Sequence, residues 1–98
     1  MKVQLQSVHF DADRKLVDFI QNKLDKLEKF FDRIIDAEVI LKLEKSGDRE
    51  NKIVEVKLNI PGNQLFAKET DKSFEAAADS AVEAVRRQLK KHKEKMYS

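Results

Sequence analysis

The sequence predicts an α+β fold in which a four-stranded, mainly antiparallel sheet has two helices packed on one face. Three observations predict it. Two segments, one in each half of the chain, repeat their apolar residues at helical spacing, and shorter segments alternate apolar with polar residues. Gly47, Pro61 and Gly62 are the only glycines and proline, and they separate the alternating segments. The resulting order, β-α-β-β-β-α, groups three strands between two helices in one domain, residues 1–98.

The first strand is expected over about residues 2–9. Val3 and Leu5 alternate with polar neighbours, after which the phase of the pattern shifts and allows a β-bulge. Asp11 or Asp13 is expected to cap the helix that follows, because a short carboxylate accepts hydrogen bonds from the free backbone N–H groups of a first turn.

The first helix is expected to end near residues 31–34, with its apolar residues within one arc. These residues are Leu16, Phe19, Ile20, Leu24, Leu27, Phe30, Phe31 and Ile34. Its polar side separates the charges, with the cations on a stripe formed by Lys15, Lys26, Lys29 and Arg33. A solvated helix usually mixes the two signs, which stabilises it by a few tenths of a kcal/mol per pair. The separation therefore favours a binding surface.

Three further strands are expected, over residues 36–45, 52–60 and 64–70. A polar hairpin loop over 46–51 joins the first two, and a tight turn over 61–63 joins the last two. The inward residues of the first two are Ala37, Val39, Leu41, Leu43, Val54, Val56, Leu58 and Ile60. The opposite face is mostly polar, which predicts a sheet with one side in water.

Asp71 is expected to cap the last helix, about residues 72–95. Its apolar arc is Phe74, Ala77, Ala78, Ala81, Val82, Val85 and Leu89, and the small alanines predict close packing. The helix ends in RRQLKKHKEK, residues 86–95, which carries six cations and one acid. Because the whole chain carries +2, this segment holds +5 and the rest sums to −3. A helix of this length, about 36 Å, is expected to overhang the core and to fray beyond Leu89.

Several functional classes find no support in the sequence. The chain has no cysteine, and His9 and His92 are too few and too far apart for a typical transition-metal site. His92 continues the apolar arc of the last helix, where either packing or contact with a phosphate is expected, rather than a role as a metal ligand. Ser7, His9 and Asp11 lie close in sequence, but alternation along a strand does not build a catalytic triad. We therefore expect no enzyme, no cofactor, no metal and no small-molecule substrate.

The expected location is the cytoplasm, without a membrane partner. The N-terminus has no apolar run followed by a small-residue cleavage site. No apolar run approaches the roughly 18–20 residues that span a bilayer.

Six parts of the chain carry a family resemblance: KLDKLEKFFDRI (residues 23–34), VILKLEK (39–45), Glu55, GNQLFA (62–67), FEAAAD (74–79) and RRQLKKHKEK (86–95). In these segments the chain resembles the ribosome hibernation promoting factors, which include the ribosome-associated inhibitor proteins. Two features depart from the family pattern: the acidic segment HFDADRK before the first helix, and Phe74 where tyrosine is common.

The resemblance implies a fold similar to double-stranded-RNA-binding domains. It implies binding to the small ribosomal subunit and its rRNA, in the channel of mRNA and tRNA, which blocks translation and preserves idle ribosomes during stress or stationary phase. A second hibernation factor is an optional partner, and the end at Ser98 resembles the short type, without a C-terminal dimerisation domain. By position, the RNA-binding residues are Lys23, Lys26, Lys29, Arg33, Arg86, Arg87, Lys90, Lys91, Lys93 and Lys95.

Two other classes of function stay open. A general double-stranded-RNA-binding module would bind naked duplex RNA as well as it binds ribosomes. A helix-mediated protein interaction domain would form a stable oligomer that is insensitive to salt. A binder of rRNA phosphates is instead expected to weaken steeply as salt rises.

Overall fold

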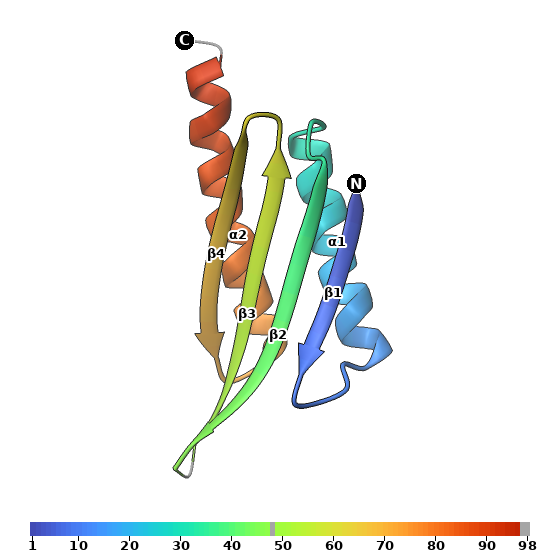
Figure 1. Ribbon diagram of the computed structural model, residues 1–98, viewed down its shortest axis with the longest axis vertical. Coiled ribbons are helices and arrows are strands. Elements are labelled where there is room, and N and C mark those ends of the chain that lie inside the picture. Colours follow the sequence, from blue (N-terminus) through green and yellow to red (C-terminus); the bar gives the residue numbers. More distant parts are fainter. Residues whose placement is uncertain (48, 97–98) are drawn as a thin grey trace.

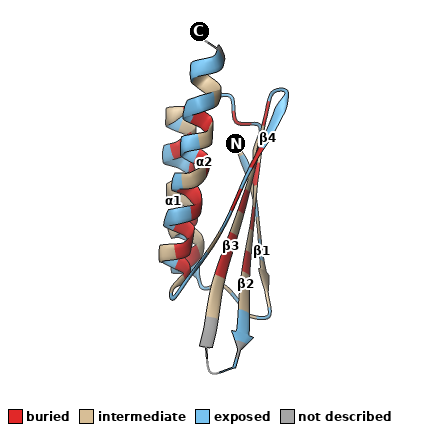
Figure 2. Cartoon of the chain, turned by 90° about the vertical axis from the view of Figure 1, so that its left-hand side faces the viewer, coloured by how far each residue is buried: buried red, intermediate tan, exposed pale blue. Residues whose placement is uncertain are grey.

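The computed structural model of the chain describes residues 1–47 and 49–96 (Figure 1). Its elements in chain order are β1 (Lys2–Val8), α1 (Arg14–Phe30), β2 (Asp36–Ser46), β3 (Arg49–Ile60), β4 (Asn63–Asp71) and α2 (Phe74–Met96). The four strands form one sheet in the order β1-β2-β3-β4, and both helices cover the same face of it (Figures 1 and 2). The predicted α+β fold, with a mainly antiparallel sheet, is confirmed.

β1 and β2 run parallel, which makes the sheet mixed. The connection through α1 allows this, since it carries the chain back to the end of the sheet where β1 begins. Their pairing is continuous from Lys2↔Asp36 to Val8↔Lys42, so the predicted bulge is wrong. The apolar pattern shifts because the strand ends at Val8, and His9 then takes a left-handed backbone conformation (φ 72°) that turns the chain.

The two hairpins differ in how well the sequence predicted them. β2 and β3 stay paired as far as Ser46↔Arg49. The predicted loop over residues 46–51 is therefore wrong for Ser46 and for residues 49–51, which belong to the strands. Asp48 lies outside the described residues. Polar residues continue both strands there because the hairpin extends past the helices, where neither face needs to be apolar (Figure 1). The predicted turn between β3 and β4 is confirmed: Gly62 adopts φ 76°, which glycine tolerates without strain.

Helix α1 begins at one of its two candidate caps. The Asp13 carboxylate accepts a hydrogen bond from the Leu16 N–H at 2.8 Å, so Asp13 and not Asp11 is the N-cap. The helix ends at Phe30, earlier than predicted, where the Phe31 N–H donates to the Leu27 carbonyl at 3.0 Å. Phe31 and Ile34 are buried as predicted, although both lie beyond the helix.

Helix α2 begins two residues later than predicted, and its cap is not Asp71. Asp71 ends β4, where its carboxylate accepts from the Lys72 N–H at 2.7 Å. Ser73 is the cap instead: its hydroxyl accepts from the Ala76 N–H at 3.1 Å. A serine just before the first turn satisfies the same free backbone groups as an aspartate there.

One core lies between the sheet and the two helices (Figure 2). Ala77, Ala78 and Ala81 are completely buried, which confirms the predicted close packing of α2. The other face of the sheet carries cross-strand ion pairs, Lys57–Glu38 at 3.4 Å and Lys42–Glu55 at 2.9 Å. The hydrogen bond and the charge of Glu55 raise the pKa of Lys42 above its ordinary value. The predicted wet side of the sheet is therefore present.

Within the described ranges, no helix has both the length and the apolar character to cross a membrane.

Candidate nucleic-acid interface

The basic residues of both helices gather along a line of grooves between α1 and α2. The first groove, of about 290 Å³, has Lys23, Lys26 and Arg86 among its lining residues. Two acids, Asp79 and Glu83, line it as well. A second, of about 310 Å³, contains Arg86, Arg87 and Lys90. A third, of about 250 Å³, contains Lys29, Arg33 and Lys93. We call these three grooves and their lining residues the basic surface.

Among the residues that the structure describes, Phe30 alone lines all three of these grooves. The charged groups of Arg86 and Lys93 each lie 4.9 Å from the centre of its ring. The Lys93 ammonium also donates a hydrogen bond to the Phe30 carbonyl at 3.2 Å. Sequence reasoning placed Phe30 only in the apolar arc, and so missed this role. No signal in the sequence separates Phe30 from the core residues, because an apolar helix face is wide enough to include it.

Lys23 is a predicted cation with an acidic partner inside the protein. Its ammonium forms an ion pair and hydrogen bond with the Asp79 carboxylate, which joins α1 to α2. It also lies 5.3 Å from the centre of the Phe19 ring. Part of its charge is therefore compensated within the protein.

Most of the remaining predicted cations are exposed and uncompensated. Six of them form no ion pair with any other residue that the structure describes: Lys26, Lys29, Arg33, Arg87, Lys90 and Lys91. Such cations are available to an external anion.

The structure thus brings eight of the ten predicted residues onto the basic surface, and the other two, Lys91 and Lys95, line none of its grooves. Lys15, which the predicted stripe included, also lies outside them. Three acids, Asp32, Asp79 and Glu83, interrupt the surface.

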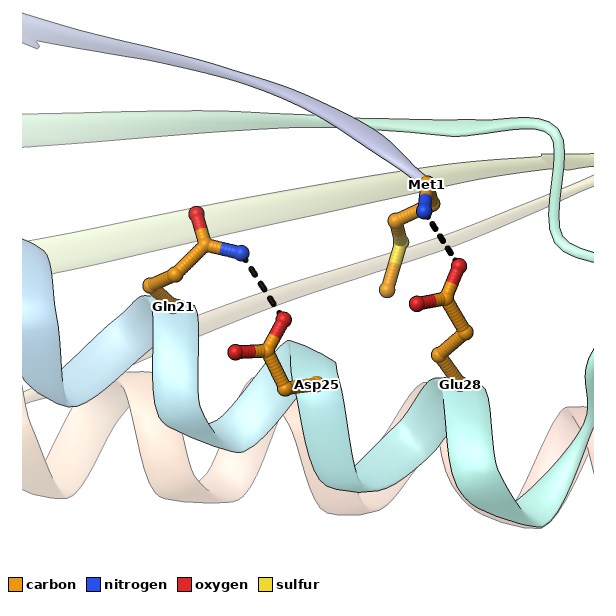
Figure 3. A network of polar contacts seen from close by, with 4 residues as sticks. All are labelled: Met1, Gln21, Asp25 and Glu28. Atoms are coloured by element: carbon orange, nitrogen blue, oxygen red, sulfur yellow. Dashed lines mark hydrogen bonds and ion pairs between the residues drawn. The ribbon is translucent and has the colours of Figure 1, made fainter.

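Two acidic residues of α1 form contacts within the protein and away from the basic surface. Glu28 pairs with the ammonium of Met1 at the start of β1, and Asp25 accepts a hydrogen bond from Gln21 at 2.9 Å (Figure 3). Figure 3 shows Glu28 pointing toward β1. The predicted separation of charges on α1 is therefore matched by the structure: cations of α1 line the grooves beside α2, and Glu28 contacts the start of β1.

The C-terminal part of α2 is better supported than predicted. The His92 ring packs edge-on against Phe31, with ring centres 6.0 Å apart, so packing is the one of its two expected roles that the structure shows. Together with the contacts of Lys93, this holds the turn after Leu89, where little support was expected. The last residues of α2 extend past the end of the sheet, as predicted (Figure 1).

Comparisons with known proteins agree with this fold. The family model described as "Sigma 54 modulation protein / S30EA ribosomal protein" matches residues 3–97. A ribosome hibernation promoting factor of Pseudomonas putida is 37% identical over 98 residues, which are 100% of this chain and 92% of that protein. The protein of the same name from Escherichia coli K12 is 30% identical over 96 residues, covering 98% of this chain and 97% of that one.

Two solved structures share the fold. A ribosomal subunit interface protein from Coxiella burnetii superposes with a TM-score of 0.85 at 22% identity, over 95% of this chain and 98% of that one. The N-terminal domain of Thermus thermophilus Protein Y gives a TM-score of 0.81 at 26% identity, over 94% and 99%. The resemblance to the ribosome hibernation promoting factors is confirmed along the full chain, which belongs to the Sigma 54 modulation protein / S30EA ribosomal protein family.

Proposed function

We propose that the chain is a ribosome hibernation factor that binds the small ribosomal subunit in the channel of mRNA and tRNA. Bound there, it blocks translation and preserves idle ribosomes during stress or stationary phase. The observation that carries the proposal is the basic surface, to which two helices contribute around one aromatic residue. The names of the full-length relatives support the ribosome as partner, and this role belongs to the cytoplasm.

The physical basis of binding is the neutralisation of rRNA phosphates. Each lysine or arginine that meets a phosphate releases condensed counterions, which favours binding at low salt. Arg33, Arg86 and Arg87 can also hold two phosphate oxygens with paired N–H groups, a geometry that lysine lacks. Inhibition then follows from occupancy of the channel, because a bound protein excludes mRNA and tRNA without any chemical step.

The surface is suited to folded RNA rather than to single-stranded bases. Recognition of single-stranded bases relies on exposed aromatic side chains that stack on them. Among the described residues the large exposed hydrophobic side chains are Ile35 and Phe66, and Phe66 points away from the helices on β4. The cations therefore read the shape and the phosphates of the RNA.

A charge-reversal experiment tests the proposal. Arg86, Arg87 and Lys90 are changed together to Glu, which alters the net charge by −6 and removes the cations of one groove. We expect co-sedimentation with small subunits to be lost, while circular dichroism keeps the spectrum of the folded protein.

A matched control has the same change of net charge away from the basic surface. Lys2, Lys68 and Lys72 are exposed and line none of its grooves, so their change to Glu is expected to preserve most of the binding. If both triple variants retain binding, or lose it equally, the basic surface is not the binding site.

The same sedimentation separates the alternatives. Preference for intact subunits over naked duplex RNA supports a ribosomal site, and equal affinity for both indicates a general RNA-binding module. A salt-insensitive oligomer of the free protein indicates a protein interaction domain. Peaks of paired ribosomes in the gradient show whether ribosomes are dimerised or only silenced, with or without a second hibernation factor.

A further inference from the structure

Phe30 occupies an unusual place for a large aromatic side chain. It is half-buried, at the last position of α1, whereas its neighbour Phe31 is 5% exposed and belongs to the core. The Phe30 ring packs partly against the core and partly against cations of α2. Neither packing alone nor solubility explains why the three grooves meet at this residue.

The ring of Phe30 is in contact with two charged groups from α2. Arg86 and Lys93 are seven residues apart on α2, which places them on one face of the helix and about 10 Å apart along its axis. Each charge nevertheless lies 4.9 Å from the same ring centre, so their separation cannot exceed twice that distance. The two side chains therefore converge on the Phe30 ring.

Both cations keep donors for an outside ligand. The Arg86 contact with the ring is a cation–π contact, and no hydrogen bond to another described residue uses its five N–H donors. Lys93 donates one of its three N–H groups to the carbonyl of Phe30. Phe30 is the last residue of α1, where carbonyls have no partner inside the helix. Two donors of Lys93 remain.

We propose that Phe30 is a positioning residue of the basic surface: it holds Arg86 and Lys93 ready for RNA phosphates and does not itself stack on a base. The inference rests on the proposed function and deepens it. Long cationic side chains lose rotamer freedom when they bind a phosphate, and a ring that restrains them beforehand reduces that loss. The ligand is a phosphate because its oxygens accept hydrogen bonds from the guanidinium of Arg86 and the ammonium of Lys93, the two groups that the ring restrains.

The test compares three phenylalanine variants in small-subunit binding at several salt concentrations. Phe30→Leu keeps the charge and much of the apolar volume but removes the ring. We expect its affinity to fall about tenfold, which corresponds to two side chains that must now be ordered on binding. We also expect the log–log salt slope to become shallower by up to about 1, because an Arg86 or Lys93 side chain that the ring no longer restrains misses its phosphate in part of the complexes. Phe30→Tyr keeps the ring and is expected to bind within about twofold of wild type.

Phe19→Leu is the matched control. Phe19 is a half-buried phenylalanine on the same helix, but the cation near its ring, Lys23, is already paired with Asp79. Its loss is expected to leave the salt slope unchanged. Wild-type affinity and slope in Phe30→Leu would overturn the inference, and so would an equal change of slope in Phe19→Leu.

A measurement on the free wild-type protein keeps the inference testable if Phe30→Leu fails to fold. Protons near the face of an aromatic ring resonate upfield, so the side-chain protons of Arg86 and Lys93 are expected to shift upfield in NMR spectra. Ordinary shifts for both residues would overturn the positioning role. Absence of any salt-dependent binding by wild type would instead overturn the proposed function, whatever the NMR spectra show.

Discussion

At the scale of single residues, two neighbouring phenylalanines perform different tasks. Phe31 is buried and packs against His92, whereas Phe30 meets the cations of α2. The sequence placed both in the apolar arc, which was correct for Phe31 and incomplete for Phe30. Periodicity gives the direction of a side chain around its own helix, but it contains no information about which residues of another helix stand opposite.

The Lys23–Asp79 pair shows the same limit. Lys23 matched the pattern of a free cation, but its partner is 56 positions away in the sequence. Because both side chains are partly or largely exposed, the pair is expected to contribute only about 0–1 kcal/mol to stability. Its main effect is to reduce the positive charge of one groove.

Changing Asp79 to Asn is therefore expected to strengthen binding. The substitution removes a negative charge from the basic surface and frees Lys23, so we expect the small-subunit affinity to rise a few-fold. The free energy of unfolding should fall by less than about 1 kcal/mol. Binding isotherms and urea titrations measure the two effects.

Asp18→Asn is the control. Asp18 pairs with Arg14 at 3.4 Å within α1, and neither residue lines a groove of the basic surface. This variant makes the same change of net charge. An equal gain of affinity in both variants would mean that overall charge, and not the groove, determines binding.

At the scale of elements, the strands and helices could be predicted, while their ends were less accurate. Alternation and helical spacing are repeated signals, so all six elements were located. An end depends on one or two hydrogen bonds, and several residues could supply them. Asp71 and Ser73 are both chemically suitable caps, and the sequence alone does not show that β4 continues through Asp71.

Removal of the α1 cap is expected to destabilise the protein. Asp13→Ala leaves the Leu16 N–H without its side-chain acceptor, so the free energy of unfolding should fall by about 1 kcal/mol. Asp11→Ala removes the same charge two residues earlier and should change stability by less than about 0.5 kcal/mol. Urea unfolding followed by circular dichroism checks both values, and a larger loss in Asp11→Ala would contradict the assignment of the cap.

At the scale of the whole molecule, the charges are distributed between different faces. The segment 86–95 holds +5 of a chain that carries only +2 in total, and Glu28 of α1 points toward β1, where it pairs with Met1 (Figure 3). The sequence predicted both helices on one face of the sheet, and the family resemblance implied cations of both as RNA-binding residues. It could not predict the convergence on Phe30, which requires the relative position of α1 and α2.

The central claim is that a basic surface binds the phosphates of small-subunit rRNA. Its most direct test is the affinity of the wild-type protein for purified small subunits over a range of salt concentrations. About five or more phosphate contacts predict a log–log slope steeper than about −3. An affinity that stays constant as salt rises would contradict the claim and point to a contact with protein instead.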